Sequence, residues 1–287
     1  IAPVERLLER LLREWKPDAV VCTYMVYPYM LDSLASRTGR AVPYLTVVTD
    51  SFVINKSWLC SKSPLWAVTD PWTRAIMEEK GLPQDRLRVT GFPVNPVLGA
   101  LAKEHPLSWK EGEPFRVLYF AQRSARHARA ELAGMLDANP ALHVTCILGR
   151  RFRRIYPRIR DLRARYGRRL TVRGWTRRVP SYLAASHVVV GKAGGATVHE
   201  VLAAARPMLV NFLLPGQEEG NTRLLEKLGG GSHVPDARAL ASALQEMMAD
   251  GGAQWRRMHE NLLRAGMTGG SGRIADLALK LAEEHTN

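Results

Sequence analysis

The stretch that decides the fold is Val188-Val-Val-Gly-Lys-Ala-Gly-Gly-Ala-Thr-Val-His-Glu-Val-Leu-Ala-Ala-Ala205, continuing through Arg-Pro-Met-Leu-Val-Asn-Phe-Leu-Leu-Pro-Gly-Gln-Glu-Glu-Gly-Asn221. Its short β-branched run, Val188 to Val190, predicts a buried parallel strand. Gly194 and Gly195 follow, and a helical pattern then runs from about Ala196 to Ala205. Strand, glycine turn and helix start bring backbone N–H groups and the positive end of a helix dipole together, which suits a phosphate.

The second half of this stretch adds groups that suit a sugar. Glu200 lies about one turn into the predicted helix, where a carboxylate can accept hydrogen bonds from ribose hydroxyls. Met208 to Val210 predicts the next strand, and Pro215-Gly216 turns the chain back before another helix that begins with Gln217, Glu218 and Asn221. The stretch therefore predicts a nucleotide-sugar site, and the alternative is a tight helix–strand turn without a ligand.

The ordered pattern of Lys192-Ala-Gly-Gly195, Glu200 and Pro215-Gly-Gln-Glu-Glu-Gly-Asn221 resembles the signature of the monogalactosyldiacylglycerol synthases and the bacterial processive diacylglycerol glucosyltransferases. It is more distantly similar to the N-acetylglucosaminyltransferase of peptidoglycan lipid synthesis. The resemblance implies an α/β fold, the GT-B arrangement of two facing Rossmann-like domains. It also implies transfer of a hexose from a UDP-sugar to a diacylglycerol-like lipid acceptor at the membrane surface, with no cofactor and no metal, because the helix dipole and arginines take the place of a cation.

The resemblance implies a role for each donor-site residue. Gly194, Gly195 and Thr197 would hold the diphosphate, Glu200 the ribose, and the start of the following helix the sugar. Trp175 lies in Gly174-Trp-Thr-Arg-Arg178, the loop that packs on uracil in the resembling enzymes; a buried structural tryptophan is the alternative. The implied donor-binding set is Gly149, Arg150, Trp175, Thr176, Lys192, Gly194, Gly195, Thr197, Glu200, Gln217, Glu218 and Asn221.

The loop after the predicted strand Arg116 to Phe120 departs from the family. The resembling enzymes have a glycine-rich loop here, near the donor phosphates, whereas this chain has Ala121-Gln-Arg-Ser-Ala-Arg-His127 without a glycine. Arg123 and Arg126 can supply positive charge in place of backbone N–H groups. The alternative is a weakened donor site.

The first third of the chain alternates strands with helices, which predicts a second parallel sheet. The predicted strands are Ala19 to Thr23, Tyr44 to Val48, Ala67 to Thr69 and Arg88 to Thr90. The domain opens with an amphipathic helix instead of a strand, so it would lack its first strand and glycine-rich loop. We expect an acceptor-side domain at 1–97, a linker at 98–114 and a nucleotide-sugar-binding domain at 115–287, whose terminal helix returns to the first domain.

Acceptor-side residues follow from the resemblance alone. Val47-Val-Thr-Asp50, Asn55, Trp58 and Gly91-Phe-Pro-Val-Asn-Pro96 match the acceptor domain, so Asn55, Trp58 and Asn95 are the implied acceptor-side residues. The family commonly has histidine at Asn55 and arginine at Asn95. Its histidine base lies in a segment with no counterpart after Ile1, which leaves Asp50 as the catalytic candidate and a helix or turn cap as its alternative.

These departures leave a second hypothesis open. The chain would then be a catalytically weak or inactive nucleotide-sugar-binding subunit, completed by a partner chain that supplies the missing N-terminal segment. A UDP-sugar 2-epimerase on the same fold is a further alternative, but the sequence lacks the expected cluster of acidic and histidine residues.

Composition limits the remaining classes. The 287 residues carry a formal charge of +14, with arginines densest from Arg150 to Arg178, which favours a solvated face or an anionic membrane surface. Nucleic acid is not expected, since no binding motif accompanies the charge. Cys22, Cys60 and Cys146 show no disulfide or zinc spacing, and no apolar run approaches the ~20 residues of a spanning helix. We therefore expect a cytoplasmic, peripherally membrane-associated protein.

Overall fold

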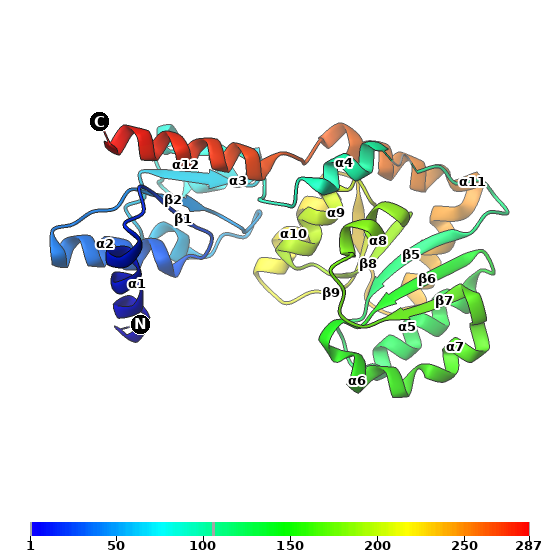
Figure 1. The fold of residues 1–287 in the computed structure, drawn as a ribbon. Helices are drawn as coiled ribbons and strands as arrows, with labels where there is room; N and C mark the ends of the chain where they lie inside the picture. Colours follow the sequence, from blue (N-terminus) through cyan, green and yellow to red (C-terminus); the bar gives the residue numbers. More distant parts are fainter. Residues whose placement is uncertain (1, 105–106, 287) are drawn as a thin grey trace. The chain divides into compact units, whose positions relative to one another are not determined.

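The computed structural model describes residues 2–104 and 107–286. Contacts divide the chain into two compact units, Ile1–Pro93 with Gly269–Asn287 and Val94–Thr268. Each unit is built on one wholly parallel sheet with helices between the strands (Figure 1), so the predicted α/β class is confirmed.

The first unit has a four-stranded sheet in the order β1-β2-β3-β4. Its strands are β1 (Val20–Cys22), β2 (Tyr44–Val47), β3 (Leu65–Val68) and β4 (Leu87–Val89), which confirms the four predicted strands. Its N-terminal helices are α1 (Ala2–Trp15), α2 (Val26–Thr38) and α3 (Pro71–Glu79), with 3-10 turns η1 (Lys56–Leu59) and η2 (Gln84–Arg86). Asp70 caps α3 by accepting a hydrogen bond from Thr73 N, and Pro71 fills the first helical position, where no N–H is needed.

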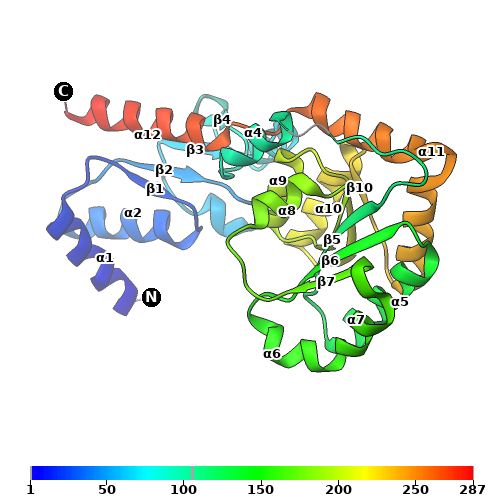
Figure 2. The ribbon, with the colours of Figure 1, turned by 45° about the vertical axis from the view of Figure 1, so that its right-hand side comes forward.

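The last helix, α12 (Gly270–Thr286), lies along the sheet of this first unit (Figure 2). Its apolar face packs against β2 and β3, with Ile274 and Leu277 contacting the cluster of Leu45, Val47 and Ala67. Glycine is required where the helix begins, because a Cβ on Gly270 would lie 2.1 Å from the carbonyl oxygen of Phe92. The chain between α11, which ends at Ala265, and α12 is Gly266–Gly269.

The second unit has a six-stranded sheet in the order β10-β9-β8-β5-β6-β7. The strands are β5 (Phe115–Phe120), β6 (Leu142–Ile147), β7 (Leu170–Arg173), β8 (Val188–Lys192), β9 (Met208–Phe212) and β10 (Gly231–His233). The strand order runs outward in both directions from the adjacent pair β5 and β8. This is the doubly wound order, and β5/β8 is its topological switch point.

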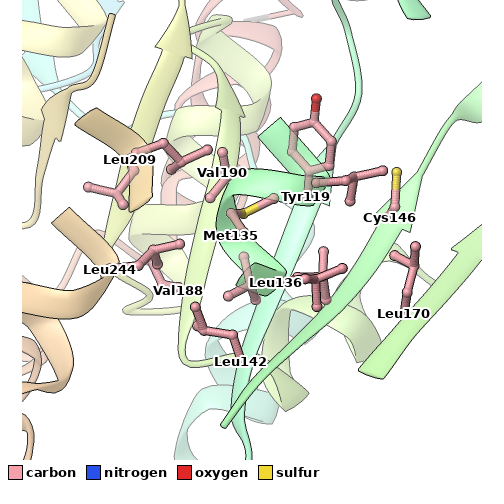
Figure 3. Packing of buried hydrophobic residues seen from close by; sticks show 14 of the residues in the cluster. Tyr119, Met135, Leu136, Leu142, Cys146, Leu170, Val188, Val190, Leu209 and Leu244 are labelled. Atoms are coloured by element: carbon pink, nitrogen blue, oxygen red, sulfur yellow. The ribbon is translucent and has the colours of Figure 1, made fainter. Parts of the chain in front are cut away.

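Helices cover both faces of this sheet (Figures 1 and 2). One face carries α4 (Val97–Glu104), α8 (Val179–Ala185), α9 (Gly195–Ala203) and α10 (Gln217–Lys227). The other face carries α5 (Ala125–Ala138), α6 (Phe152–Ile155), α7 (Arg160–Tyr166) and α11 (Ala237–Ala265). Three 3-10 turns accompany the helices of this second face: η3 (Gly149–Arg151), η4 (Tyr156–Arg158) and η5 (Gly167–Arg169). Alternate strand residues such as Val188, Val190 and Leu209 pack against Met135 and Leu244 (Figure 3). This buried apolar layer holds the strand ends in fixed positions.

The segment expected to be a linker contains a helix. The stretch 98–114 is not simply a linker, because α4 packs against α8 and α9 and Leu98 and Trp109 are buried. Helix α11 bends at residues 249–252, where Asp250, Gly251 and Gly252 have positive φ.

Candidate functional site

The predicted donor residues gather at one edge of the six-stranded sheet. All of its strand pairs are parallel, so the carboxyl ends of the strands share that edge. Gly149 and Arg150 follow β6, Trp175 and Thr176 follow β7, and the remaining donor residues end β8 or follow β8 and β9. Open α/β sheets bind ligands at this edge, beside the switch point.

The turn between β8 and α9 is built on two glycines. Gly194 is the N-cap of α9 at φ −68° and ψ 140°, and no side chain caps the helix. The first N–H groups of a helix have no intrahelical acceptor, so those after Gly194 can bind an anion. Neither glycine has a positive φ, and glycine is among the residues preferred at a helix N-cap. Thr197 is half-buried in the same turn.

Glu200 is half-buried one turn further along α9. Burial raises the pKa of its carboxyl above the ordinary value, because the charged form has lost part of its hydration. Hydrogen bonds from ribose hydroxyls would replace that hydration.

The signature residues at the start of α10 are tied to the end of β8. Glu218 forms an ion pair with Lys192, and its Oε2 accepts a hydrogen bond from Leu214 N at 2.7 Å. Asn221 is fully buried and donates from Nδ2 to the carbonyl oxygen of Ala193 at 2.9 Å. Both side chains therefore shape the turn after β8, whereas Gln217 is exposed. Contact of these residues with the sugar stays a prediction.

The loop after β7 presents an aromatic ring to solvent. Trp175 is 60% exposed, so the buried structural alternative is wrong. The guanidinium carbon of Arg177 lies 5.6 Å from the centre of its ring, and Thr176 Oγ1 accepts a hydrogen bond from Arg178 N at 3.0 Å. Nearby, Gly149 starts the 3-10 turn η3 at φ +56° and Arg150 is exposed. An exposed ring at this edge is able to stack on a base.

A buried polar cluster below the loop after β5 was missed by sequence reasoning. Glu131 on α5 is buried, and its Oε2 accepts hydrogen bonds from Tyr119 OH at 2.5 Å and Asn211 Nδ2 at 2.7 Å. Arg123 Nη1 lies 3.4 Å from the other oxygen, Oε1. The sequence holds one sign of this cluster, because Glu131 lies among Ala128, Leu132 and Met135, which form the buried face of α5. Arg126, in contrast, is exposed on that helix.

The expected acceptor-side residues of the first unit have structural partners. Asp50 is 1% exposed, and its Oδ2 accepts a hydrogen bond from Trp58 Nε1 at 2.9 Å. Trp58 is itself buried in an apolar cluster, and its acceptor-side role stays a prediction. Asn55 caps η1 by accepting from Ser57 N at 2.9 Å. Through these contacts Asp50 fixes the turn after β2. Catalysis by Asp50 stays a prediction.

Asn95 belongs to the second unit and is exposed. Its Oδ1 accepts a hydrogen bond from Val97 N at 3.1 Å at the start of α4. Asparagine is a preferred residue at such helix starts, and the acceptor-side role of Asn95 stays a prediction.

Within residues 2–104 and 107–286, no group of three or more His, Cys, Asp or Glu side chains is arranged to hold a metal ion. No helix in the described part of the chain is long and apolar enough to cross a membrane.

Comparisons with known proteins follow the two units. Residues 2–94 match the family model of monogalactosyldiacylglycerol (MGDG) synthase, and residues 131–271 match the glycosyltransferase family 28 C-terminal domain. The processive diacylglycerol beta-glucosyltransferase of Bacillus subtilis is 24% identical over 285 residues, which cover 97% of this chain and 73% of that enzyme. Among eight relatives with this name from Bacillus and Staphylococcus, the chain spans 58% to 73% of the relative's length.

Solved structures show the same fold. MurG of Acinetobacter baumannii is 16% identical with a TM-score of 0.65, over 94% of this chain and 76% of that chain. The UDP-GlcNAc 2-epimerase of Neisseria meningitidis is 14% identical with a TM-score of 0.68, over 96% of this chain and 80% of that chain. The fold is thus common to transferases and epimerases. The family matches are what distinguish these two classes of enzyme for this chain. These matches confirm the resemblance to the MGDG synthases at residues 2–94 and to the C-terminal domain of glycosyltransferase family 28 at residues 131–271.

Proposed function

We propose that this chain is a glycosyltransferase that transfers a hexose from a UDP-sugar to a diacylglycerol-like lipid acceptor. The observation that carries the proposal is the turn after β8, where the uncapped start of α9 stands beside the switch point and Glu200 follows one turn later. The family matches and the names of the relatives support the reaction class and the lipid acceptor.

The parts of the donor would meet different elements. The N–H groups at the start of α9, with Gly194, Gly195 and Thr197, hold the diphosphate and stabilise the negative charge of the leaving UDP. Glu200 accepts hydrogen bonds from the ribose, and Trp175 stacks on the uracil. Gln217 faces the hexose, while Lys192, Glu218 and Asn221 fix the turn beside it. In this proposal the helix dipole and nearby arginines supply the positive charge, so the reaction needs no metal.

The lipid acceptor implies work at a membrane surface, and the charge of the second unit supports peripheral binding there. Exposed arginines cover the segment from η3 to α7, namely Arg150, Arg151, Arg153, Arg154, Arg158, Arg160, Arg163 and Arg165. Such a surface is attracted to anionic lipid head groups.

The test combines binding with transfer. We expect UDP to bind, and Glu200→Ala to weaken it about ten- to a hundredfold, the loss of a hydrogen bond to a charged group. Glu226→Ala, which removes an exposed carboxylate from α10, is the matched control and should bind UDP as the wild type does.

Transfer is measured with radiolabelled UDP-glucose and UDP-galactose on diacylglycerol vesicles. Labelled glycolipid that disappears in Glu200→Ala supports the proposal. UDP binding without any glycolipid product would support the nucleotide-sugar-binding subunit instead, and equal UDP affinity in wild type and Glu200→Ala would remove Glu200 from the site.

A further inference from the structure

A cavity of about 330 Å³ lies at the amino ends of β5, β6 and β7, at the opposite edge of the six-stranded sheet from the candidate donor site. Three arginines line it: Arg116 in β5, and Arg168 and Arg169 just before β7. Of the described residues that line it, none carries a carboxylate. The charge of this amino-end cavity therefore favours an anion.

The face of the sheet at the floor of the amino-end cavity is polar. Wholly parallel sheets are ordinarily apolar on both faces, because helices cover them. Side chains alternate along β6, and Cys146 belongs to the buried apolar layer, so His143 and Thr145 point to the other face, where the cavity lies. The register of the strands places Arg116 beside His143. In the same way it places Thr145 beside Thr171, so hydrogen-bonding side chains gather where this fold ordinarily has apolar ones.

These side chains are not used by the rest of the described chain. His143, Thr145 and Thr171 are half-buried, as is Tyr182 of α8 on the wall of the cavity. Within residues 2–104 and 107–286, none of these four side chains makes a hydrogen bond. Half-buried polar groups without a protein partner are satisfied by water or by a ligand. The imidazole and the hydroxyl groups are all able to donate hydrogen bonds to an anion.

The charges around the floor are held in place. Arg116 Nε donates to the carbonyl oxygen of Ala185 at 2.6 Å, and Nη2 lies 3.2 Å from His187 Nε2. Its Nη1 makes no hydrogen bond to a described residue, so an already oriented guanidinium offers this donor to a ligand. Burial, together with the positive charges of Arg169 and Arg116, lowers the pKa of His143. A bound anion would offset that repulsion.

We propose that the amino-end cavity binds a phosphate group, which Arg116 and Arg168 hold by charge. The hydroxyl groups of Thr145 and Thr171 donate to phosphate oxygens from the floor, while a guanidinium forms paired hydrogen bonds to them. The site uses none of the donor residues, so the inference does not depend on the proposed function. Its ligand is either a soluble phosphate ester or the head group of an anionic phospholipid, since both present the same oxygens.

NMR of the histidine rings with inorganic phosphate gives a local test. The ring signals of His143, assigned with His143→Asn, should shift as phosphate is added. The pKa of His143 should rise towards its ordinary value, because a neighbouring anion favours the charged ring. Sodium chloride at the same ionic strength is the control for screening and should change this pKa less. Equal effects of phosphate and chloride would overturn the inference.

Thr171→Val and Arg168→Ala test whether the cavity or the general surface charge binds phosphate. Each should weaken phosphate about tenfold, as expected for the loss of a hydrogen bond to a charged group. Thr171→Val does so without changing the net charge. Arg257→Ala removes an exposed arginine that does not line the cavity, and it should stay within about twofold. Equal effects of Arg168→Ala and Arg257→Ala, with none in Thr171→Val, would contradict a site in this cavity.

Two further ligands distinguish the sources of the phosphate group. Glycerol 3-phosphate presents it in solution, and vesicles with phosphatidic acid present it at a membrane surface. If Thr171→Val weakens glycerol 3-phosphate alone, the ligand is soluble; if it also weakens vesicle binding, the site takes a phospholipid head group. Both results support the site, whereas unchanged binding of both ligands in Thr171→Val and Arg168→Ala rejects it. A chain that binds phosphate here but no UDP would keep this inference and reject the proposed function.

Discussion

Lys192, the last residue of β8, forms an ion pair with Glu218 in the first turn of α10. The Glu218 side chain is 9% exposed and that of Lys192 is 28% exposed. Because Glu218 also accepts from Leu214 N, the pair fixes the whole Leu214–Glu218 turn against the end of the strand. This contact explains why lysine and glutamate, 26 residues apart, belong to one sequence signature.

Replacing the cation of this pair should cost stability. In Lys192→Met, Glu218 stays charged and nearly buried without its partner, and we expect about 1–3 kcal/mol less free energy of unfolding, below the loss for a fully buried pair. Urea denaturation measures it. Arg129→Met, which breaks the exposed pair with Asp161, is the control and should lose less. Lys192→Met/Glu218→Gln should recover part of the loss, and a Lys192→Met midpoint equal to that of the wild type would contradict the prediction.

Trp175 should act on the base and not on the phosphates. Stacking on an aromatic side chain is worth about 1–3 kcal/mol per base, so Trp175→Ala should weaken both uridine and UDP about five- to a hundredfold. Trp175→Phe should restore most of the affinity. The ring is 60% exposed, so the thermal midpoint should not change. Calorimetry with uridine checks this, and unchanged uridine affinity in Trp175→Ala would remove the ring from the base site.

The strands could be predicted from the sequence because each is a local run of β-branched and apolar residues. The order of the strands in the sheet could not be predicted. Nothing within Phe115–Phe120 or Val188–Lys192 indicates that β5 and β8 are neighbours, since this pairing joins distant segments. Strand β10 was missed because Gly231-Ser-His233 has no apolar run. Helix α5 was missed because its first turn, Ala125-Arg-His-Ala128, is polar, and its apolar period begins only later.

The candidate site also has one part that could be predicted from the sequence and one part that could not. Turn and helix at Gly194 were predictable from one continuous stretch. Arg123, Glu131 and Asn211 were not, because Glu131 and Asn211 are 80 residues apart and meet only in the folded sheet. The family pattern implies acceptor-side roles for Asp50 and Trp58, and only the folded structure shows that these two residues hydrogen-bond to each other in the interior.

Asp50 offers a test of that structural role. Asp50→Ala would leave the buried Trp58 N–H without this acceptor, and we expect about 1–3 kcal/mol less free energy of unfolding. Asp50→Asn keeps an oxygen acceptor and should lose less. Full stability of Asp50→Asn together with complete loss of glycolipid formation would instead identify the carboxylate as the catalytic base.

Acid should destabilise the second unit through His187. This ring is buried, and its Nδ1 accepts a hydrogen bond from Arg116 N at 2.8 Å. Burial, helped by the charge of Arg116, lowers the His187 pKa from 6.5 to about 4. The unfolded chain therefore takes up a proton near pH 6.5 that the folded protein refuses until about pH 4. Stability is fully present above pH 6.5 and is lost progressively as the pH falls towards 4.

His187→Asn should make that loss smaller. The variant keeps an acceptor for Arg116 N but cannot titrate, so the slope of unfolding free energy against pH between 5 and 6 should fall by about 1.4 kcal/mol per pH unit. Urea denaturation at a series of pH values measures the slope. An identical slope in wild type and variant would show that His187 is not the group responsible.

Membrane binding should depend on the arginines of α6 and α7. Arg153, Arg160 and Arg163 are exposed, so replacing all three by glutamine removes charge without touching the core. Attraction between surface charges is screened within ~10 Å at 0.1 M salt, so wild-type binding to phosphatidylglycerol vesicles should fall steeply as salt rises. The triple variant should bind more weakly and respond less to salt.

The control replaces Arg238, Arg257 and Arg264 by glutamine. This change removes the same charge, but these arginines are not on this segment. An equal loss in both triple variants would show that net charge governs binding and not this surface, and binding that ignores salt and lipid charge would return the arginines to a solvated face.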